Sequence, residues 1–226
     1  MIISGTRLVG GRYVSPGTVT AGLIMDLDAG DPASYPGAGP IWADLSGSGN
    51  DATLIGSTPW TSAGNLSYFT FNLGVGYAQG GSILPNTTYT KVVIFQVAGN
   101  FLNLISGDAS NQHAFWGAGT QFLQAGHNGA WSTIVSPFPT PLGQWVFGAV
   151  SFSSTTGWRL YLDGILVETN PDTTQFSANP AQVQIGAYDG SNNLIGNVAV
   201  ARVYNRVLSD SEVATLFNYY NSRFSF

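Results

Sequence analysis

Glycine and proline interrupt this chain at short intervals. The 226 residues include 29 glycines and 11 prolines, and the runs between them are rich in Val, Ile, Phe, Tyr and Thr. Because glycine and proline favour turns, while β-branched and aromatic residues favour strands, this pattern predicts many short strands. Twelve runs fit a strand: residues 23–29, 68–72, 91–98, 101–106, 113–117, 122–127, 132–135, 145–153, 158–162, 165–169, 182–186 and 195–204. So many strands indicate an all-β protein of two packed antiparallel sheets.

One β-hairpin is predicted by the stretch "WRLYLDGILVET". Asp163 and Gly164 separate two alternating runs, and Asp-Gly suits the positive φ angles of a type I′ turn. The two runs should therefore pair as neighbouring strands. Alternation places Trp158, Leu160 and Leu162 on one face of the hairpin.

The domain organisation is simple. Residues 30–56 contain little that could pair as a strand, so we expect a long surface connection held by Trp42 and Leu45. No linker or run of charge divides the chain, and all-β sandwiches of this length are commonly one domain. We expect a sandwich over residues 21–226, preceded by an N-terminal arm over residues 1–20.

The stretch "SDSEVATLFNYY" changes from strand alternation to a helical pattern. Ser209 and Glu212 fit a capping box, in which each side chain accepts a hydrogen bond from the other residue's backbone N–H. The spacing that follows places four apolar residues on one helix face: Val213, Leu216, Phe217 and Tyr220. One short C-terminal helix should therefore lie against the sandwich.

Three stretches together resemble the concanavalin A-like lectin/glucanase superfamily. They are "GLIMDLDAGDPASYPGAGPIWADLSGSGNDATL", "WRLYLDGILV" and "IGAYDGSNNLIGNVAVARVYNRVLSDSEVATLF". The resemblance is to its laminin-G-like (LamG type 3) variant, found in many viral structural proteins, including those of phage virions, and in large extracellular proteins. It implies a two-sheet antiparallel jelly-roll β-sandwich, in which Tyr-Asn-Arg-x-Leu-Ser leads from a late strand into a closing helix.

Charge and cysteine content exclude several classes of function. Charged residues make up 8% of the chain, with a formal net charge of −5. No basic surface is available to neutralise phosphates, so we expect neither nucleic acid nor a membrane as a partner. The absence of cysteine excludes disulfides and thiolate metal sites. The N-terminus lacks the pattern of a secretory signal, and no run of about 18 apolar residues predicts a membrane span.

Glycoside hydrolysis is the first enzymatic alternative, because the superfamily includes glucanases. A retaining glycosidase needs two carboxylates about 5 Å apart, and the family's glucanases place theirs as Glu-x-Asp-x-x-Glu on one strand. The two glutamates of this chain, Glu168 and Glu212, belong to no such triplet. Neither of the two histidines, His113 and His127, stands at a spacing from a serine and an acidic residue that would suggest a catalytic triad. We expect no enzymatic activity.

A calcium site is an open alternative. The stretch "IGAYDGSNN" resembles the place where pentraxins, related members of the superfamily, carry a Glu-Gln-Asp calcium cluster. Asp189 matches the Asp, whereas Ala187 and Tyr188 stand at the other two positions. Five further aspartates lie near glycine-rich turns: Asp26, Asp28, Asp31, Asp44 and Asp51. Because aspartate in such turns usually bonds local backbone, we expect no cofactor and keep Asp189 as the candidate metal ligand.

Sugar binding without a metal typically uses an exposed aromatic side chain flanked by amides. The segment "FWGAGTQFLQAGHNGAWS" supplies such residues around a predicted hairpin. The candidate glycan-binding residues are Trp116, Gln124, His127, Asn128 and Trp131.

A virion surface role is the third hypothesis, and the one that we favour from sequence. The arm alternates enough to add a strand to a neighbour's sheet; a first strand of the same sandwich is the equally weighted alternative. Its candidate attachment residues are Ile2, Leu8, Val9, Tyr13 and Val14. We predict a non-enzymatic capsid decoration, knob or fibre protein that contacts other virion proteins and in addition cell-surface glycans. The alternative function is a carbohydrate-binding lectin module in a non-viral extracellular setting. A second copy of the chain, in a homo-oligomer, is a further candidate partner.

Overall fold

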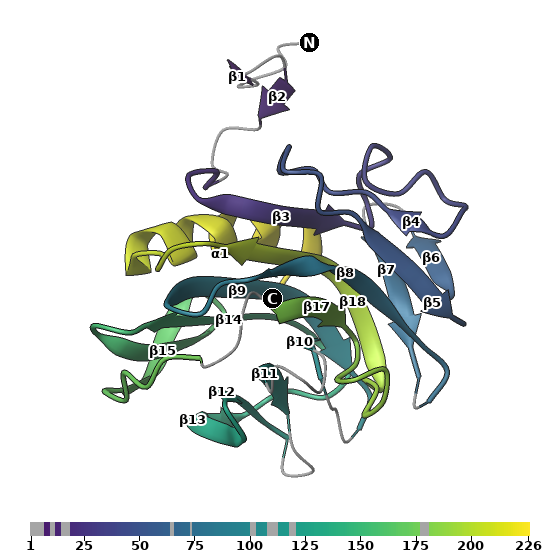
Figure 1. Cartoon of the computed structure of the whole chain (residues 1–226). Coiled ribbons are helices and arrows are strands. Elements are labelled where there is room, and N and C mark those ends of the chain that lie inside the picture. The colour runs from purple at the N-terminus through teal and green to yellow at the C-terminus, as the bar shows by residue number, and fades with distance from the viewer. Residues whose placement is uncertain are drawn as a thin grey trace.

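The larger of the two main sheets has eight strands (Figure 1). The computed structural model describes residues 7–9, 12–14, 19–63, 66–72, 74–99, 103–107, 113–117, 121–176 and 181–226. The strands run in the order β16 (Ile165–Asn170), β15 (Gly157–Leu162), β14 (Trp145–Ser153), β9 (Thr88–Val97), β18 (Gly196–Tyr204), β7 (Leu66–Phe71) and β6 (Trp60–Ala63), and β3 (Leu23–Asp28) also pairs with β18. All of these pairings are antiparallel.

The second sheet faces the first across the core. Its strands run in the order β10 (Ile105–Ser106), β17 (Ala181–Ile185), β8 (Gly76–Leu84), β5 (Ala52–Gly56) and β4 (Ile41–Trp42). A three-stranded sheet follows: β11 (His113–Gly117), β12 (Phe122–His127) and β13 (Ala130–Pro139). The backbone N–H of Leu104 donates to Phe115 at 2.9 Å, and that of Gly107 donates to His113 at 2.7 Å. These bonds join β10 to β11, so that the three-stranded sheet continues the second sheet.

The strand and turn predictions are confirmed. Each of the twelve predicted runs holds a strand, although β10 occupies only the end of its run. Asp163 and Gly164 have φ angles of 46° and 77°, and Leu162 pairs with Ile165, as a type I′ hairpin requires.

The predicted surface connection over residues 30–56 is wrong. This segment contributes β4 and β5, which pair with each other and then with β8. These strands are short or rich in glycine, and their pairing partners stabilise them more than local propensity does. Trp42 does hold the segment, because its side chain is fully buried in the core.

Both faces of the larger sheet are buried. Large apolar side chains fill the space between the sheets, among them Phe69, Phe95, Phe115, Phe152 and Ile185. The helix α1 (Asp210–Phe224) covers the other face and begins with the predicted capping box at Ser209 and Glu212. In contrast, the outer face of the second sheet is open, where Ile41, Thr53 and Ile55 are exposed, and Val135 is exposed on the three-stranded sheet.

The N-terminal arm contains a small hairpin. Strands β1 (Arg7–Val9) and β2 (Arg12–Val14) pair with each other, with Leu8 opposite Tyr13. The predicted attachment residues Leu8, Val9, Tyr13 and Val14 lie in this hairpin, and Ile2 lies outside the described residues. The carbonyl of Val19, after the arm hairpin, accepts a hydrogen bond from the Tyr204 hydroxyl of the sandwich at 3.0 Å. Within the described chain, no helix has the length and apolar character of a bilayer span.

Candidate functional site

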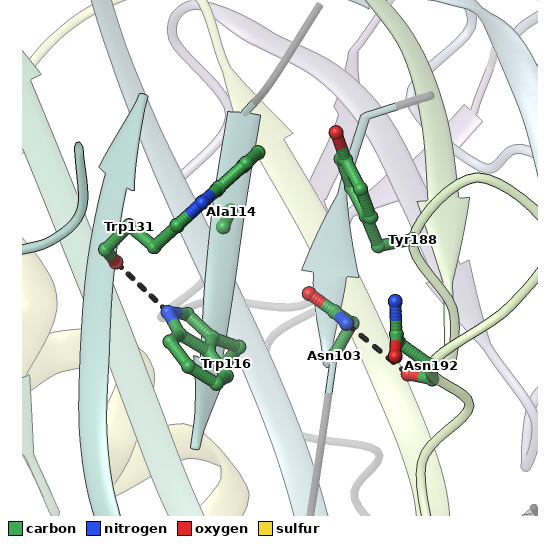
Figure 2. Close-up of a pocket in the computed structure, with 6 residues that line it drawn as sticks. All are labelled: Asn103, Ala114, Trp116, Trp131, Tyr188 and Asn192. Atoms are coloured by element: carbon green, nitrogen blue, oxygen red, sulfur yellow. Dashed lines mark hydrogen bonds between the residues drawn. The ribbon is translucent and has the colours of Figure 1, made fainter. Parts of the chain in front are cut away.

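A pocket opens on the outer face of the second sheet and its three-stranded continuation. It has a volume of about 260 Å³. Figure 2 shows the residues that line it: Asn103, Ala114, Trp116, Trp131, Tyr188 and Asn192. These residues come from three separate parts of the sequence.

The first wall of the pocket is built on β11. Successive side chains of a strand point to opposite faces, and Phe115 points into the core between the sheets. Ala114 and Trp116 therefore point outward into the pocket. Trp116 lies opposite Gln124 of β12, so that the two side chains share the outer face.

The second wall is Trp131, which a tight turn brings over this face. Asn128 and Gly129 have φ angles of 55° and 81° and connect β12 to β13 as a type I′ turn. An alanine in place of Gly126 would collide with the carbonyl oxygen of Ala130, so only glycine allows this close approach. The indole Nε1 of Trp116 donates to the backbone carbonyl of Trp131 at 2.8 Å (Figure 2). This bond fixes the two tryptophans relative to each other.

The third wall is Tyr188, which belongs to another type I′ turn. Tyr188 and Ser191 exchange two backbone hydrogen bonds of 2.9 Å, and Asp189 and Gly190 between them have φ angles of 53° and 63°. The Tyr188 ring meets the Trp131 ring edge to face, with centroids 5.1 Å apart and an interplanar angle of 72°. This geometry is a favourable one for an aromatic pair and fixes the corner of the pocket.

Two asparagines supply the polar side of the pocket. The side-chain nitrogen of Asn103 donates to the carbonyl of Asn192 at 3.1 Å (Figure 2). The side-chain oxygen of Asn103 accepts from the Ser106 hydroxyl at 2.7 Å. Asn103 is therefore held in place, while Asn192 is exposed at the rim. The site combines apolar aromatic surface with a few oriented amides, as ligand pockets commonly do.

The structure separates the five candidate glycan-binding residues. Trp116 and Trp131 line the pocket, and Gln124 lies beside Trp116 on the same face but is only 5% exposed. His127 is 3% exposed and packs among core aromatic rings, with its Nε2 2.7 Å from the Thr174 carbonyl. Asn128 occupies the turn and donates to the carbonyl of Gln175 at 2.7 Å. Neither His127 nor Asn128 lines the pocket.

The sequence prediction missed Tyr188, Asn103 and Asn192. The stretch "IGAYDGSNN", which holds the candidate metal ligand Asp189, also supplies the Tyr188 wall. Asp189 is exposed and has the positive φ of its turn. Among the described residues, no three His, Asp or Glu side chains gather as a metal cluster. An Asp-Gly dipeptide favours a type I′ turn, and Asp189-Gly190 is the sequence signal from which this turn could have been predicted.

The other aspartates mainly hold loops in place. The Asp44 carboxylate accepts hydrogen bonds from the backbone N–H groups of Asp26, Ser46 and Asn50 at 2.8 to 3.0 Å. Asp51 accepts from the N–H of Asp44 at 2.7 Å, and Asp31 accepts from that of Ala33 at 2.8 Å. The bonds from Ser46 and Ala33 are the local ones that aspartate forms in turns, whereas the bond from Asp26 joins residues 18 apart and ties the loop to β3.

Sequence comparison identifies one family. The model of the laminin G type 3 family, described as the concanavalin A-like lectin/glucanases superfamily, matches residues 83–214, which is more than half of the chain. No curated protein sequence matches the chain.

Several solved structures share the fold. Domain 4 of AbnA, an extracellular GH43 arabinanase from Geobacillus stearothermophilus solved in complex with arabinotriose, has a TM-score of 0.67 at 15% identity; the match covers 87% of this chain and 98% of that domain. Trypanosoma rangeli sialidase in complex with sialic acid has a TM-score of 0.66 at 19% identity, covering 95% of this chain and only 35% of the sialidase. The binding domain of botulinum neurotoxin DC in complex with SialylT has a TM-score of 0.67 at 12% identity, covering 88% of this chain and 52% of that one.

These likenesses concern the fold, because all three identities are low. The family match is independent of them and covers the second half of the sandwich, including the pocket strands β11 to β13. The chain therefore belongs to the concanavalin A-like lectin/glucanase superfamily, within its laminin G type 3 family.

Proposed function

We propose that the chain is a non-enzymatic carbohydrate-binding domain whose sugar site is the pocket between Trp116, Trp131 and Tyr188. The observation that carries this proposal is the chemistry of that pocket, in which three aromatic side chains and two amides converge on an open sheet face. Aromatic rings offer flat apolar surface to the C–H faces of a sugar, and amides donate and accept hydrogen bonds with its hydroxyls.

The neighbouring folds support this proposal at the level of architecture. The arabinanase domain was solved with arabinotriose and matches over almost its whole length. That arabinanase is extracellular, and an extracellular setting with glycans as partners is accordingly our proposal for this chain.

A binding role without catalysis agrees with the use of the two glutamates. Glu212 pairs with Arg206 at 2.7 Å and accepts from the Ser209 backbone, and the hydrogen bond from Arg206 lowers its pKa to about 2. Glu168 accepts from the backbone N–H of Thr169 at 2.9 Å. A carboxylate with so low a pKa is a poor general acid at neutral pH, and neither glutamate lines the pocket.

Replacing Trp131 with alanine should weaken sugar binding at least about tenfold, because central aromatic side chains carry much of the affinity of such sites. The measurement is titration calorimetry with arabinotriose and a panel of neutral mono- and oligosaccharides. The matched control is Phe138→Ala, because Phe138 lies on the same strand, is 58% exposed and is outside the pocket. Equal affinity in Trp131→Ala and the unmodified chain would show that the sugar binds elsewhere.

The virion surface role stays a prediction, and its structural element is the N-terminal arm. Deleting residues 1–18 keeps the contact of Val19 with Tyr204, so the melting temperature should change by less than about 2 °C. The same deletion should abolish incorporation into virus particles, measured by quantitative mass spectrometry of gradient-purified particles. Normal incorporation of the shortened chain would exclude the arm as the attachment element, and absence of the full chain from particles would exclude the virion role.

A further inference from the structure

We infer that the pocket selects uncharged sugars over sugars that carry a carboxylate, such as uronic acids and sialic acid. This inference rests on the proposed function and names its ligand class. It depends on the chemical groups that line the pocket and on the partners of the arginine and lysine side chains.

The pocket is lined by neutral groups. Two indoles, one phenol, two carboxamides and a methyl group form its described surface. One of the two indole N–H groups already donates to the Trp131 carbonyl, and the side-chain N–H of Asn103 donates to Asn192. A sugar carboxylate loses water when it enters such a site and needs a cation or several donors in compensation. Hydroxyls need far less, because single hydrogen bonds to amides satisfy them.

The described arginine and lysine side chains of the sandwich are engaged elsewhere. Four arginines form ion pairs: Arg159 with Asp210, Arg202 with Asp26, Arg206 with Glu212 and Arg223 with Asp28, at 2.6 to 2.8 Å. Lys91, the single lysine of the chain, is fully buried between the sheets, where its Nζ lies 2.8 Å from the Ile105 carbonyl and 2.7 Å from His113 Nδ1. An arginine fork is the usual partner of a carboxylate ligand, and these five side chains already have partners.

The remaining sequence adds no cation near the pocket strands. Residues 100–102, 108–112, 118–120 and 177–180 contain neither lysine nor arginine, and the two other arginines are in the N-terminal arm. Asp189 is exposed in the turn that carries Tyr188, and its negative charge disfavours an anionic ligand at this rim. The lack of lysine and arginine in these segments and the negative charge of Asp189 both disfavour an anionic sugar.

The test compares neutral sugars with their acidic counterparts. Calorimetric or NMR titrations would use galactose with galacturonic acid, glucose with glucuronic acid, and lactose with 3′-sialyllactose. For each pair that binds, we expect the neutral member to bind at least ten times more tightly, and we expect Trp131→Ala to abolish that binding while Phe138→Ala leaves it unchanged. The difference should persist in 0.5 M NaCl, which screens the net charge of the whole chain but not the chemistry of the pocket.

The outcomes separate this inference from the proposed function. An acidic sugar that binds equally well or better, with binding lost in Trp131→Ala, overturns the selectivity and leaves the sugar site standing. A preference that disappears in 0.5 M NaCl also overturns it, because net charge would then be the cause. Binding of none of these sugars, or binding that Trp131→Ala leaves unchanged, overturns the sugar site and the selectivity together.

Discussion

Replacing Asp26 with asparagine should lower the free energy of unfolding by about 3–5 kcal/mol, because it leaves a buried arginine without its counter-ion. Asp26 and Arg202 form two hydrogen bonds, of 2.8 and 3.0 Å, and both side chains are buried. The guanidinium of Arg202 also lies 5.2 Å from the ring centroid of Tyr220 on α1. The pair therefore joins β3 and β18 beneath the helix. Urea denaturation at neutral pH measures the loss.

The matched control is Asp210→Asn, which breaks the ion pair with Arg159. The Arg159 side chain is 33% exposed and the Asp210 side chain is 61% exposed. Exposed ion pairs contribute only about 1 kcal/mol or less to stability. If Asp26→Asn lowers the free energy of unfolding no more than Asp210→Asn does, the sandwich tolerates a buried Arg202 without its counter-ion.

The unmodified protein should become more stable as pH rises toward 9.5, and Lys91→Met should remove this rise. Burial lowers the pKa of Lys91 well below its usual 10.5. Between the lowered pKa and 10.5, the unfolded chain binds a proton that the folded chain does not, so stability increases by up to about 1.4 kcal/mol per pH unit. Methionine keeps a similar length without a titratable group.

This pH window isolates Lys91 from its titratable neighbours. Burial also lowers the pKa of His113 well below 6.5 and raises that of Tyr89 well above 10. The pKa of His127 is also lowered. The two histidines therefore affect stability below pH 6.5, and Tyr89 affects it above pH 10. The experiment is urea denaturation of both proteins at several pH values. Parallel pH profiles for the two proteins would show that Lys91 is not the source of the rise.

Local sequence patterns were sufficient where the determining interactions lie within a few residues. The Asp163-Gly164 turn and the capping box at Ser209 and Glu212 formed as predicted, because each depends on backbone angles and hydrogen bonds of neighbouring positions. The strands β5 and β8 were missed for the opposite reason. The sequence of β8 has three glycines in nine residues, so pairing with β5 and β17 decides its conformation rather than propensity.

The candidate site was predicted in part. Trp116 and Trp131 came from the aromatic content of one hairpin, and they do line the pocket. His127 was named from the same segment but faces the core, opposite His113. Tyr188 was not predicted to lie beside Trp131, because it is 57 residues farther along the sequence. Only the pairing of β10 with β17 and with β11 brings the two rings together.

The sequence by itself determined twelve of the strands, the turns at Asp163-Gly164 and Asn128-Gly129, the capped helix and the scarcity of charge. It also determined which side chains of a strand share a face, since that follows from the two-residue period of a strand. Only the tertiary structure decided which of the two faces is buried. It placed α1 over the larger sheet and left the outer face of β11 to β13 open. The reason is that alternation within one strand is symmetric, and only packing against distant strands and the helix distinguishes core from surface.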